Sequence, residues 1–415
     1  MAVDVVVAGA GPAGACAAHA LAGAGADVLL IERARFPRDK SCGDGVAPHA
    51  VDILHDMGVT WESFEGRGRR TYGGVIAGPG GGWFQADPPA DPQGKRFESW
   101  IVPRLLLDEQ AARAAQRAGA KLREGVAVTG LLFERGRVAG VETTDGAGVA
   151  RIPAKVVIGA DGAHSAVAKA LGFGDNPAPH RGFALRAYYD DVDGLRDDME
   201  LYYYSRRMLP GYGWVFPTGD RTANVGIGIY FGELKKHPLK LREMLEEFIT
   251  SVPHVRDRFS KARQVGKAIG WPLHVSSVRR PTAFDGAMLA GDAASLVDPL
   301  TGEGIWTALV SGRSAARAAL RALSSGDASK RALCAHEREW RSVAGGYLSA
   351  GRILKNCAKS SRLFDMIVRR ASESPYYASR AIGYGLGILD RRLALRNIVL
   401  KAVFTPSFFR APATP

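Results

Sequence analysis

The first 32 residues constrain the fold of this chain more than any other stretch. A β-branched run over Val3–Gly9 leads into Gly9-Ala-Gly11-Pro12-Ala13-Gly14, and an alanine-rich segment follows over Ala13–Ala24. A second apolar run over Asp27–Ile31 then ends on Glu32. This order predicts a buried parallel strand, a glycine turn, a helix and another buried strand. Such a βαβ unit is typical of dinucleotide-binding proteins.

The three glycines of this turn have separate physical roles. Gly9 permits the tight turn, Gly11 lets the backbone approach a pyrophosphate, and Gly14 lets the helix pack closely on the sheet. The helix N-terminus favours an anion because its free N–H groups and its dipole point toward it. Glu32 is placed to accept hydrogen bonds from ribose hydroxyls. The motif alone leaves open whether the dinucleotide is FAD or NAD.

Two later motifs favour FAD. Gly159-Ala-Asp161-Gly162-Ala-His-Ser165 follows a predicted strand, Lys155–Ile158. Ala290-Gly291-Asp292 follows a second one, Ala287–Leu289, and leads to Asp298-Pro299-Leu-Thr-Gly302-Glu-Gly304. A carboxylate at a strand end can accept a hydrogen bond from a ribityl hydroxyl. Glycines at a helix start expose amides that suit the pyrophosphate or the O2 and N1 edge of a flavin.

In this order, the three motifs resemble the flavoprotein hydroxylase superfamily, which uses one FAD and no second nucleotide fold. Within it, two stretches resemble the geranylgeranyl reductase family: Phe36-Pro-Arg-Asp-Lys40-Ser-Cys42-Gly43-Asp44-Gly45 and Tyr212-Gly-Trp214-Val-Phe216-Pro217. Val102-Pro-Arg104 and Asp108 match the family's FAD-contacting helix start. The resemblance runs from residue 1 to about 330. The Lys-Ser-Cys-Gly-Asp-Gly form is most similar to the actinobacterial menaquinone-type members.

The resemblance implies an α/β fold with a Rossmann-type FAD-binding domain like that of para-hydroxybenzoate hydroxylase. We expect this discontinuous domain to comprise residues 1–70, 101–175 and 281–330, and a substrate domain to comprise residues 71–100 and 176–280. Alternating polar and apolar residues over 181–232 predict that the substrate domain is an antiparallel sheet. Helices are expected over 104–118, 239–251 and 304–323, and throughout a C-terminal helical region, 331–415.

The resemblance also places the loop around Cys42 beside the isoalloxazine ring. There, Cys42 would act as a weak acid that protonates a reduced substrate, although a buried cysteine is also an ordinary small apolar residue. Tyr212, Trp214 and Phe216 alternate and therefore share one face of a strand, either as sheet core or as an apolar wall for a hydrocarbon. The catalytic candidates are Cys42, Gly43, Tyr212 and Trp214, and the substrate-binding candidates are Tyr212, Trp214, Phe216 and Pro217. The predicted cofactor-binding residues are Gly9, Gly11, Pro12, Ala13, Gly14, Glu32, Arg33, Cys42, Gly43, Asp44, Gly45, Arg104, Val126, Asp161, Gly162, Gly291, Asp292, Pro299, Gly302, Gly304 and Ile305.

The net charge bears on which partners the protein binds, and the cysteine content bears on disulfides and metal sites. The net charge is +13, but no run of Lys and Arg interleaved with aromatic residues indicates nucleic acid. Residues 352–410 mix basic with apolar residues, which fits either an ordinary helical cap or a basic amphipathic surface on an anionic membrane. The four cysteines are scattered, with neither a disulfide framework nor a metal pattern. We expect a cytoplasmic protein, peripheral on the inner face of the membrane.

The preferred function is hydrogenation of C=C bonds in a polyprenyl substrate: geranylgeranyl diphosphate, a geranylgeranyl lipid or a menaquinone side chain. Hydride would come from N5 of reduced, non-covalently bound FAD, and a proton from Cys42, a tyrosine or water. The runner-up is an aromatic monooxygenase that forms a flavin hydroperoxide. A halogenase is a weaker reading, because Tyr212 stands where the Trp-x-Trp-x-Ile-Pro motif has its first Trp. A flavin-bearing scaffold without turnover stays open, as does the electron donor: NAD(P)H, a ferredoxin or a quinol.

Overall fold

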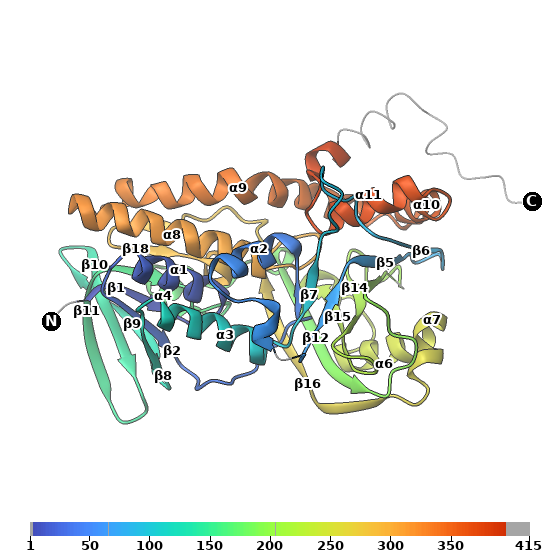
Figure 1. The fold of residues 1–415 in the computed structure, drawn as a ribbon, viewed down its shortest axis with the longest axis horizontal. Helices are drawn as coiled ribbons and strands as arrows, with labels where there is room; N and C mark the ends of the chain where they lie inside the picture. The colour runs from blue at the N-terminus through green and yellow to red at the C-terminus, as the bar shows by residue number, and fades with distance from the viewer. Residues whose placement is uncertain (1–2, 65, 204, 396–415) are drawn as a thin grey trace, which may run out of the picture.

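The chain is described by a computed structural model, which covers residues 3–64, 66–203 and 205–395. These residues form three sheets with helices packed around them, and the molecule is elongated (Figure 1). The first sheet occupies one half and the second sheet the other. The α8 and α9 helices run along the top of the first half (Figure 1).

The first sheet confirms the predicted βαβ unit. Strand β1 (Val3–Ala8) pairs in parallel with β2 (Val28–Glu32) on one side and with β11 (Val149–Gly159) on the other. Almost all residues of β1 and β2 are buried, as their apolar sequences predict. The sheet runs in the order β17 (Ala283–Phe284), β18 (Ala287–Leu289), β11, β1, β2, β8 (Lys121–Glu124). Its strands therefore come from three distant stretches of chain.

An antiparallel hairpin extends this sheet. Strands β9 (Ala127–Glu134) and β10 (Arg137–Thr144) pair antiparallel with each other. β11 is longer than predicted because its first half pairs with β10 before its second half pairs with β1.

Helices cover the first sheet closely. Helix α1 (Pro12–Gly23) packs against α8 (Ile305–Ser325), where a Cβ on Gly312 would lie 2.1 Å from the carbonyl oxygen of Ala13. Only glycine permits that approach. Around these lie α2 (Pro48–Asp56), α3 (Arg104–Arg117), α4 (Ala166–Ala170) and α9 (Lys330–Cys357). Short 3-10 turns occur at Trp61–Phe64, Ala178–His180, Asp257–Phe259 and Gly291–Ala294.

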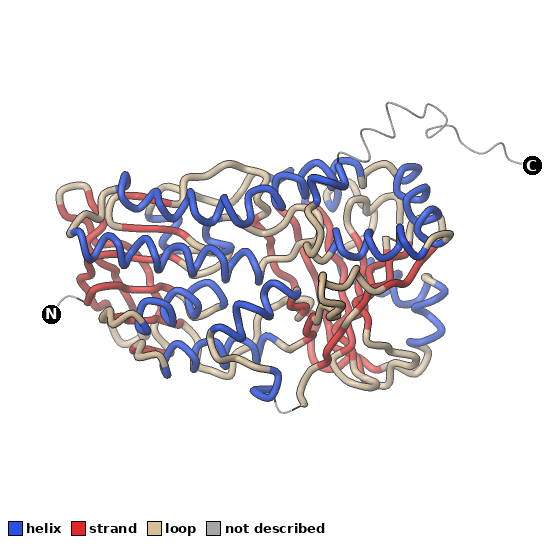
Figure 2. Tube along the Cα trace, turned by 45° about the horizontal axis from the view of Figure 1, so that its top comes forward, coloured by secondary structure: helices blue, strands red, loops and turns tan. Residues whose placement is uncertain are grey.

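The second sheet is larger than the predicted one. Its order is β16 (Arg263–His274), β12 (Arg181–Asp190), β15 (Ala223–Tyr230), β14 (Tyr212–Pro217), β13 (Asp198–Tyr202), β5 (Gly73–Ala77), β6 (Trp83–Ala86). The strands within residues 181–232 pair antiparallel, as expected, whereas β13 and β5 pair in parallel. Strand β16 was not predicted, because most of it is exposed and because Gly266, Gly270 and Pro272 interrupt its apolar residues. Figure 2 shows these strands gathered in one half of the molecule.

Smaller elements complete the second half. Helices α5 (Phe231–Leu234), α6 (Leu241–Ser251) and α7 (Pro253–Arg256) follow β15 in the chain, and α6 buries Met244, Leu245 and Phe248 against the sheet. Helices α10 (Ser361–Ser372) and α11 (Pro375–Gly385) pack on β6 through Phe84, Val368 and Ile382. The third sheet consists of β3 (Gly45–Val46), β7 (Ser99–Ile101) and β4 (Arg69–Thr71).

The C-terminal region is helical as far as α11, and the rest of that prediction, residues 396–415, lies outside the described residues. The domain boundaries given above stay a prediction. Among the described residues, no helix combines the length and apolar character that crossing a membrane requires.

Candidate functional site

A cavity of about 610 Å³ lies between the two large sheets. Its lining comes from the β1–α1 turn, the loop that follows β2, strands β5 and β14, the segment 297–305 and the end of α11. Parts of the chain that are far apart in sequence therefore share one internal surface.

The glycine turn forms one end of this cavity. Gly9 has a φ of +92°, and a Cβ on Gly14 would lie 1.8 Å from the Gly9 carbonyl oxygen, so neither position accepts another residue without a shift. A Cβ on Gly11 would meet no atom at less than 3.9 Å. The nearest atoms to it are guanidinium nitrogens of Arg38 and Arg104, each 3.9 Å away. Bare backbone at a helix start, faced by two guanidinium groups, fits a pyrophosphate.

An ion-pair network orders this end, which we call the cradle: Gly9–Gly14 with Glu32, Arg38, Arg104 and Asp108. Arg104 donates to both carboxylate oxygens of Asp108, at 2.6 and 2.7 Å. Arg38 lies 2.5 Å from Asp108 and 3.4 Å from Glu32. Burial alone would raise the pKa of Asp108, but the two arginines bring that pKa below its ordinary value. Asp108 is thus a buried anion that positions both cations.

Glu32 ends β2 at the same place. One carboxylate oxygen accepts a hydrogen bond from the backbone N–H of Ala10 and the other from that of Ala34, both at 3.1 Å. Glu32 lines the cavity, so its remaining lone pairs are available to a ribose.

The two aspartates predicted at strand ends, Asp161 and Asp292, have different hydrogen-bond and ion-pair partners. Asp161 accepts hydrogen bonds from the N–H groups of Ala166 and Val167, at 2.7 and 3.2 Å, and from the Ser165 hydroxyl. Its carboxylate therefore caps α4, even though the residue borders the cavity. Asp292 lies 3.4 Å from the ammonium of Lys40 at the cavity wall. Asp292 is better placed to meet a ligand hydroxyl.

The Cys42 loop lies next to Arg104 of the cradle and packs on β14. A Cβ on Gly43 would lie 3.1 Å from the Phe216 ring and 3.4 Å from Trp214 Nε1, so a larger residue there would have to displace the Phe216 ring by a few tenths of an ångström. The ring of Trp214 lies 6.2 Å from that of Tyr212 and 6.3 Å from that of Phe216. The three side chains share one face of the strand and all line the cavity, as their alternation predicts.

Hydrogen bonds fix the loop to the second sheet, and we call this region the seam: Cys42–Gly45 with Tyr188, Trp214 and Asn224. Asn224 donates to the carbonyl oxygen of Cys42 at 2.8 Å and to Asp44 at 2.7 Å, and accepts from Trp214 Nε1 at 3.0 Å. Asp44, with a φ of +65°, also accepts from the Tyr188 hydroxyl at 2.6 Å. Burial raises the pKa of Asp44 to about 6, against the opposing effect of these donors.

The segment 298–304 closes the cavity beside Tyr212. The Tyr212 hydroxyl donates to the Thr301 carbonyl oxygen. Asp298 pairs at 2.8 Å with Arg391, and both side chains are fully buried. Burial, with Asp298 nearby, raises the pKa of Glu303 to about 7. Glu303 lines the cavity and keeps one buried carboxylate oxygen without a hydrogen-bond partner in the described structure.

Comparisons with known proteins agree with this geometry. Residues 2–349 match the FAD binding domain family model. The chain belongs to this FAD-binding family. It is an FAD-dependent oxidoreductase. It is 36% identical over 324 residues to the menaquinone reductase of Mycobacterium tuberculosis (strain CDC 1551 / Oshkosh), covering 75% of each chain.

Two further relatives extend the comparison of this FAD-binding chain. The digeranylgeranylglycerophospholipid reductase of Methanosarcina acetivorans is 33% identical over 359 residues, covering 85% of this chain and 84% of that protein. Among solved structures, a geranylgeranyl bacteriochlorophyll reductase-like protein from Thermoplasma acidophilum superposes with a TM-score of 0.81 at 28% identity. That match covers 90% of this chain and 92% of the other.

Most of the residues predicted to bind FAD or substrate line the cavity. Three do not: Gly14, Asp44 and Pro217. Gly14 acts by letting α1 meet the turn, and Asp44 by holding the loop. Pro217 points away because it follows Phe216 in β14, where successive side chains face opposite sides. It is therefore not placed to contact a substrate in the cavity.

The site residues that were not predicted from the sequence include four charged residues. Arg38 and Lys40 lie within the quoted Cys42 loop, and Glu303 lies within the quoted Asp298 motif, so attention to charged residues inside those motifs would have found them. Arg391 lies in the C-terminal region, and nothing in its local sequence indicates a partner at Asp298.

Proposed function

We propose that this protein hydrogenates carbon–carbon double bonds of a polyprenyl chain held in the cavity. The observation that carries the proposal is the packing of the Cys42 loop on Tyr212, Trp214 and Phe216 inside a cavity that also contains the FAD cradle. An aromatic wall offers a hydrocarbon an apolar surface at low entropic cost. The names of the relatives, which specify menaquinone and a digeranylgeranyl phospholipid, point to substrates of this kind.

Reduced FAD, when bound, supplies the hydride. The protein residues orient the substrate by apolar packing, because an isolated alkene has no polar group that could form a hydrogen bond. Met199, Leu201 and Ile229 of the second sheet continue the apolar lining beyond the aromatic wall. Ile76 and Ile382 line the cavity too, so its apolar lining also includes residues of β5 and α11.

Cys42 delivers the proton in this proposal. Its backbone is fixed by Asn224, and its side chain lies near both Arg104 and Tyr212. Tyr212 is a poorer donor, because burial raises its pKa well above 10 and its hydroxyl proton is engaged by Thr301. Glu303 is a second buried group that holds a proton near neutral pH.

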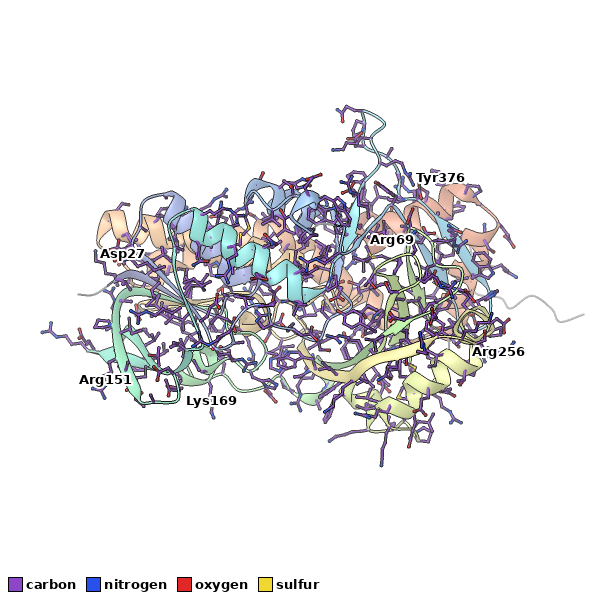
Figure 3. All side chains as sticks on the ribbon, turned by 60° about the horizontal axis from the view of Figure 1, so that its bottom comes forward. Asp27, Arg69, Arg151, Lys169, Arg256 and Tyr376 are labelled. Carbon is purple, nitrogen blue, oxygen red and sulfur yellow. The ribbon has the colours of Figure 1, made fainter. Side chains whose placement is uncertain are left out.

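The C-terminal helices are the proposed contact with an anionic membrane. The first turn of helix α11 contains Tyr376, which is 63% exposed and is labelled in Figure 3. The end of the helix lines the cavity through Ile382 and Gly385. Arg369 and Arg370 at the end of α10 add positive charge nearby. Aromatic and basic residues together favour the headgroup region of anionic lipid. Replacing Arg369 and Arg370 with Ser should weaken sedimentation with phosphatidylglycerol vesicles but leave the already weak sedimentation with phosphatidylcholine vesicles unchanged.

Anaerobic turnover tests the main proposal. The FAD-loaded protein, reduced chemically without oxygen, is incubated with geranylgeranyl diphosphate and, separately, with menaquinone, and the products are analysed by mass spectrometry. We expect a gain of two hydrogen atoms for each bond reduced. Absence of reduced product with either substrate, combined with incorporation of one oxygen atom into an aromatic substrate in air, would favour a monooxygenase instead.

A further inference from the structure

A second pocket, of about 450 Å³, lies beside the main cavity. We call it the basic pocket, and it is lined by Arg206, Arg207, Leu209, Glu233, Lys236, His237 and Lys359. The lining joins three segments: the turn before β14, the end of α5 with the residues after it, and the chain just beyond α9. Four of its seven residues are Lys or Arg, and Glu233 is its one carboxylate.

Its charges are not balanced within the protein. Glu233 lies 3.5 Å from Lys236, which is an exposed and weak pair. Among the described residues, Arg206, Arg207 and Lys359 have no carboxylate within ion-pair distance. Like charges gathered at one surface repel one another unless an anion joins them. Arginine, in particular, presents paired N–H donors that match phosphate oxygens.

Each of the three segments also reaches the main cavity. Leu209 lines the basic pocket, while the next residues, Pro210 and Gly211, line the main one. Tyr230, which lines the main cavity, leads directly into α5 and Glu233. The two pockets are thus adjacent along two chain segments.

Lys355 connects the third segment. Its ammonium lies 4.6 Å from the centre of the Tyr230 ring, at the wall of the main cavity. Burial and, secondarily, the nearby charge of Lys359 lower the pKa of Lys355. Positive charge therefore continues from the basic pocket to the edge of the apolar one.

We propose that the basic pocket is a subsite for the phosphate-bearing head group of the polyprenyl substrate whose chain occupies the main cavity. This inference rests on the function proposed above, and it adds that the head group of the substrate carries phosphate. A quinone head is neutral and would gain little from a cluster of unpaired cations. The basic pocket therefore favours a prenyl diphosphate or a prenylated phospholipid over a quinone.

The test compares a triple variant with a matched control. Arg206→Ser, Arg207→Ser and Lys359→Ser remove three charges from the basic pocket. The control replaces Arg123, Arg151 and Lys169 with Ser, which removes the same charge from exposed positions of the other half, where Figure 3 labels Arg151 and Lys169. Retention of FAD and an unchanged circular dichroism spectrum establish that both variants are folded.

The first readout is binding of inorganic diphosphate, measured by isothermal titration calorimetry on the FAD-loaded protein. We expect the dissociation constant of the triple variant to rise about tenfold to a hundredfold, since charge-assisted hydrogen bonds are lost, and that of the control to stay within about twofold. Equal diphosphate affinity in the wild type and the triple variant would overturn the proposal. This readout needs no turnover, so it still tests the pocket if the protein reduces no isoprenoid and the proposed function fails.

The second readout is preference among head groups. The ratio of kcat/KM for geranylgeranyl diphosphate to that for geranylgeraniol, which lacks the phosphates, should fall about tenfold or more in the triple variant. The same comparison with a digeranylgeranyl glycerophospholipid identifies which phosphate source the pocket serves: the substrate with the larger loss is the one it holds. Loss of binding to phosphatidylglycerol vesicles with unchanged affinity for diphosphate would make the pocket a membrane contact and overturn the proposal.

Discussion

The cradle and the seam lie at the same cavity but are built by different physics. The cradle depends on backbone that only glycine can supply, and its buried carboxylate, Asp108, is paired with two arginines. The seam depends on side-chain hydrogen bonds between residues as far apart as Cys42 and Asn224. The groups that donate hydrogen bonds to its carboxylate, Asp44, are neutral, and burial raises the pKa of Asp44 more than these donors and the nearby Arg186 guanidinium lower it. Consequently, the pKa of Asp108 is lowered, whereas that of Asp44 is raised.

This difference predicts how each region fails. A Cβ added at a cradle glycine such as Gly14 would clash with backbone atoms, which cannot rotate away as a side chain can. Such a substitution therefore disrupts the cradle as a whole. Polar links at the seam can be removed one at a time and respond to pH. We therefore expect the cradle to determine whether FAD is held, and the seam to determine how the reacting groups are arranged.

The largest expected effect comes from Gly14→Ala at the cradle. The new Cβ would lie 1.8 Å from the Gly9 carbonyl oxygen, so the turn and α1 must separate. We expect loss of bound FAD, measured as visible flavin absorbance per protein after gel filtration. Gly23→Ala, in the same helix but with no atom within 4 Å of the new Cβ, is the matched control and should keep its FAD. A yellow Gly14→Ala protein would show that close helix approach is not required.

Asp44→Ala should have the next largest effect, at the seam. It leaves the Tyr188 hydroxyl and the Asn224 amide without their buried acceptor, and it removes the acceptor of the Arg104 N–H as well. We expect a loss of about 3 kcal/mol in the free energy of unfolding, measured by urea denaturation. Asp52→Ala, whose side chain is 78% exposed, should change it by less than about 0.5 kcal/mol. FAD retention in Asp44→Ala would confirm that the two regions act separately.

Cys42→Ala tests the chemistry that the seam positions. If the thiol delivers the proton, kcat for isoprenoid reduction should fall about a hundredfold, while reoxidation of reduced flavin by oxygen stays normal. Cys42→Ser, which keeps an exchangeable proton, should recover part of the loss. Cys334→Ala, on α9 and away from the cavity, controls for loss of a thiol. Normal kcat in Cys42→Ala would leave Cys42 as a packing residue.

The same contrast explains what could be predicted from the sequence. The roles of Gly9, Gly11 and Gly14 follow from local backbone geometry, so spacing alone was sufficient to place them. The role of Asp44 depends on its hydrogen bonds with Tyr188 and Asn224, which lie on strands far along the chain. No local sequence pattern around Asp44 indicates these contacts.

The different roles of Asp161 and Asp292 could not be predicted, because the local sequence pattern around each aspartate fits two functions. An aspartate beside a glycine at a strand end suits a ligand hydroxyl and equally suits a helix start, where free N–H groups need an acceptor. The sequence could not separate Asp161, which caps α4, from Asp292, which faces the cavity. The distinction depends on where the next helix begins.

Glu303→Gln should have the smallest effect on the free energy of unfolding. It tests how the protonation of a buried carboxylate makes that free energy depend on pH. The pKa of Glu303 is raised to about 7, so its contribution to stability is present below its ordinary pKa of 4.5 and is lost as pH rises through about 7. Glutamine keeps an oxygen for the N–H of Trp306 and does not ionise. Between pH 5 and 7, the free energy of unfolding of the wild type should therefore fall by about 2 kcal/mol relative to that of the variant. Glu134→Gln, at the exposed end of β9, should follow the wild type at every pH. Parallel pH curves for the wild type and Glu303→Gln would mean that Glu303 is ionised in the folded protein, and that this side of the cavity, like the cradle, stabilises its buried carboxylate as an anion.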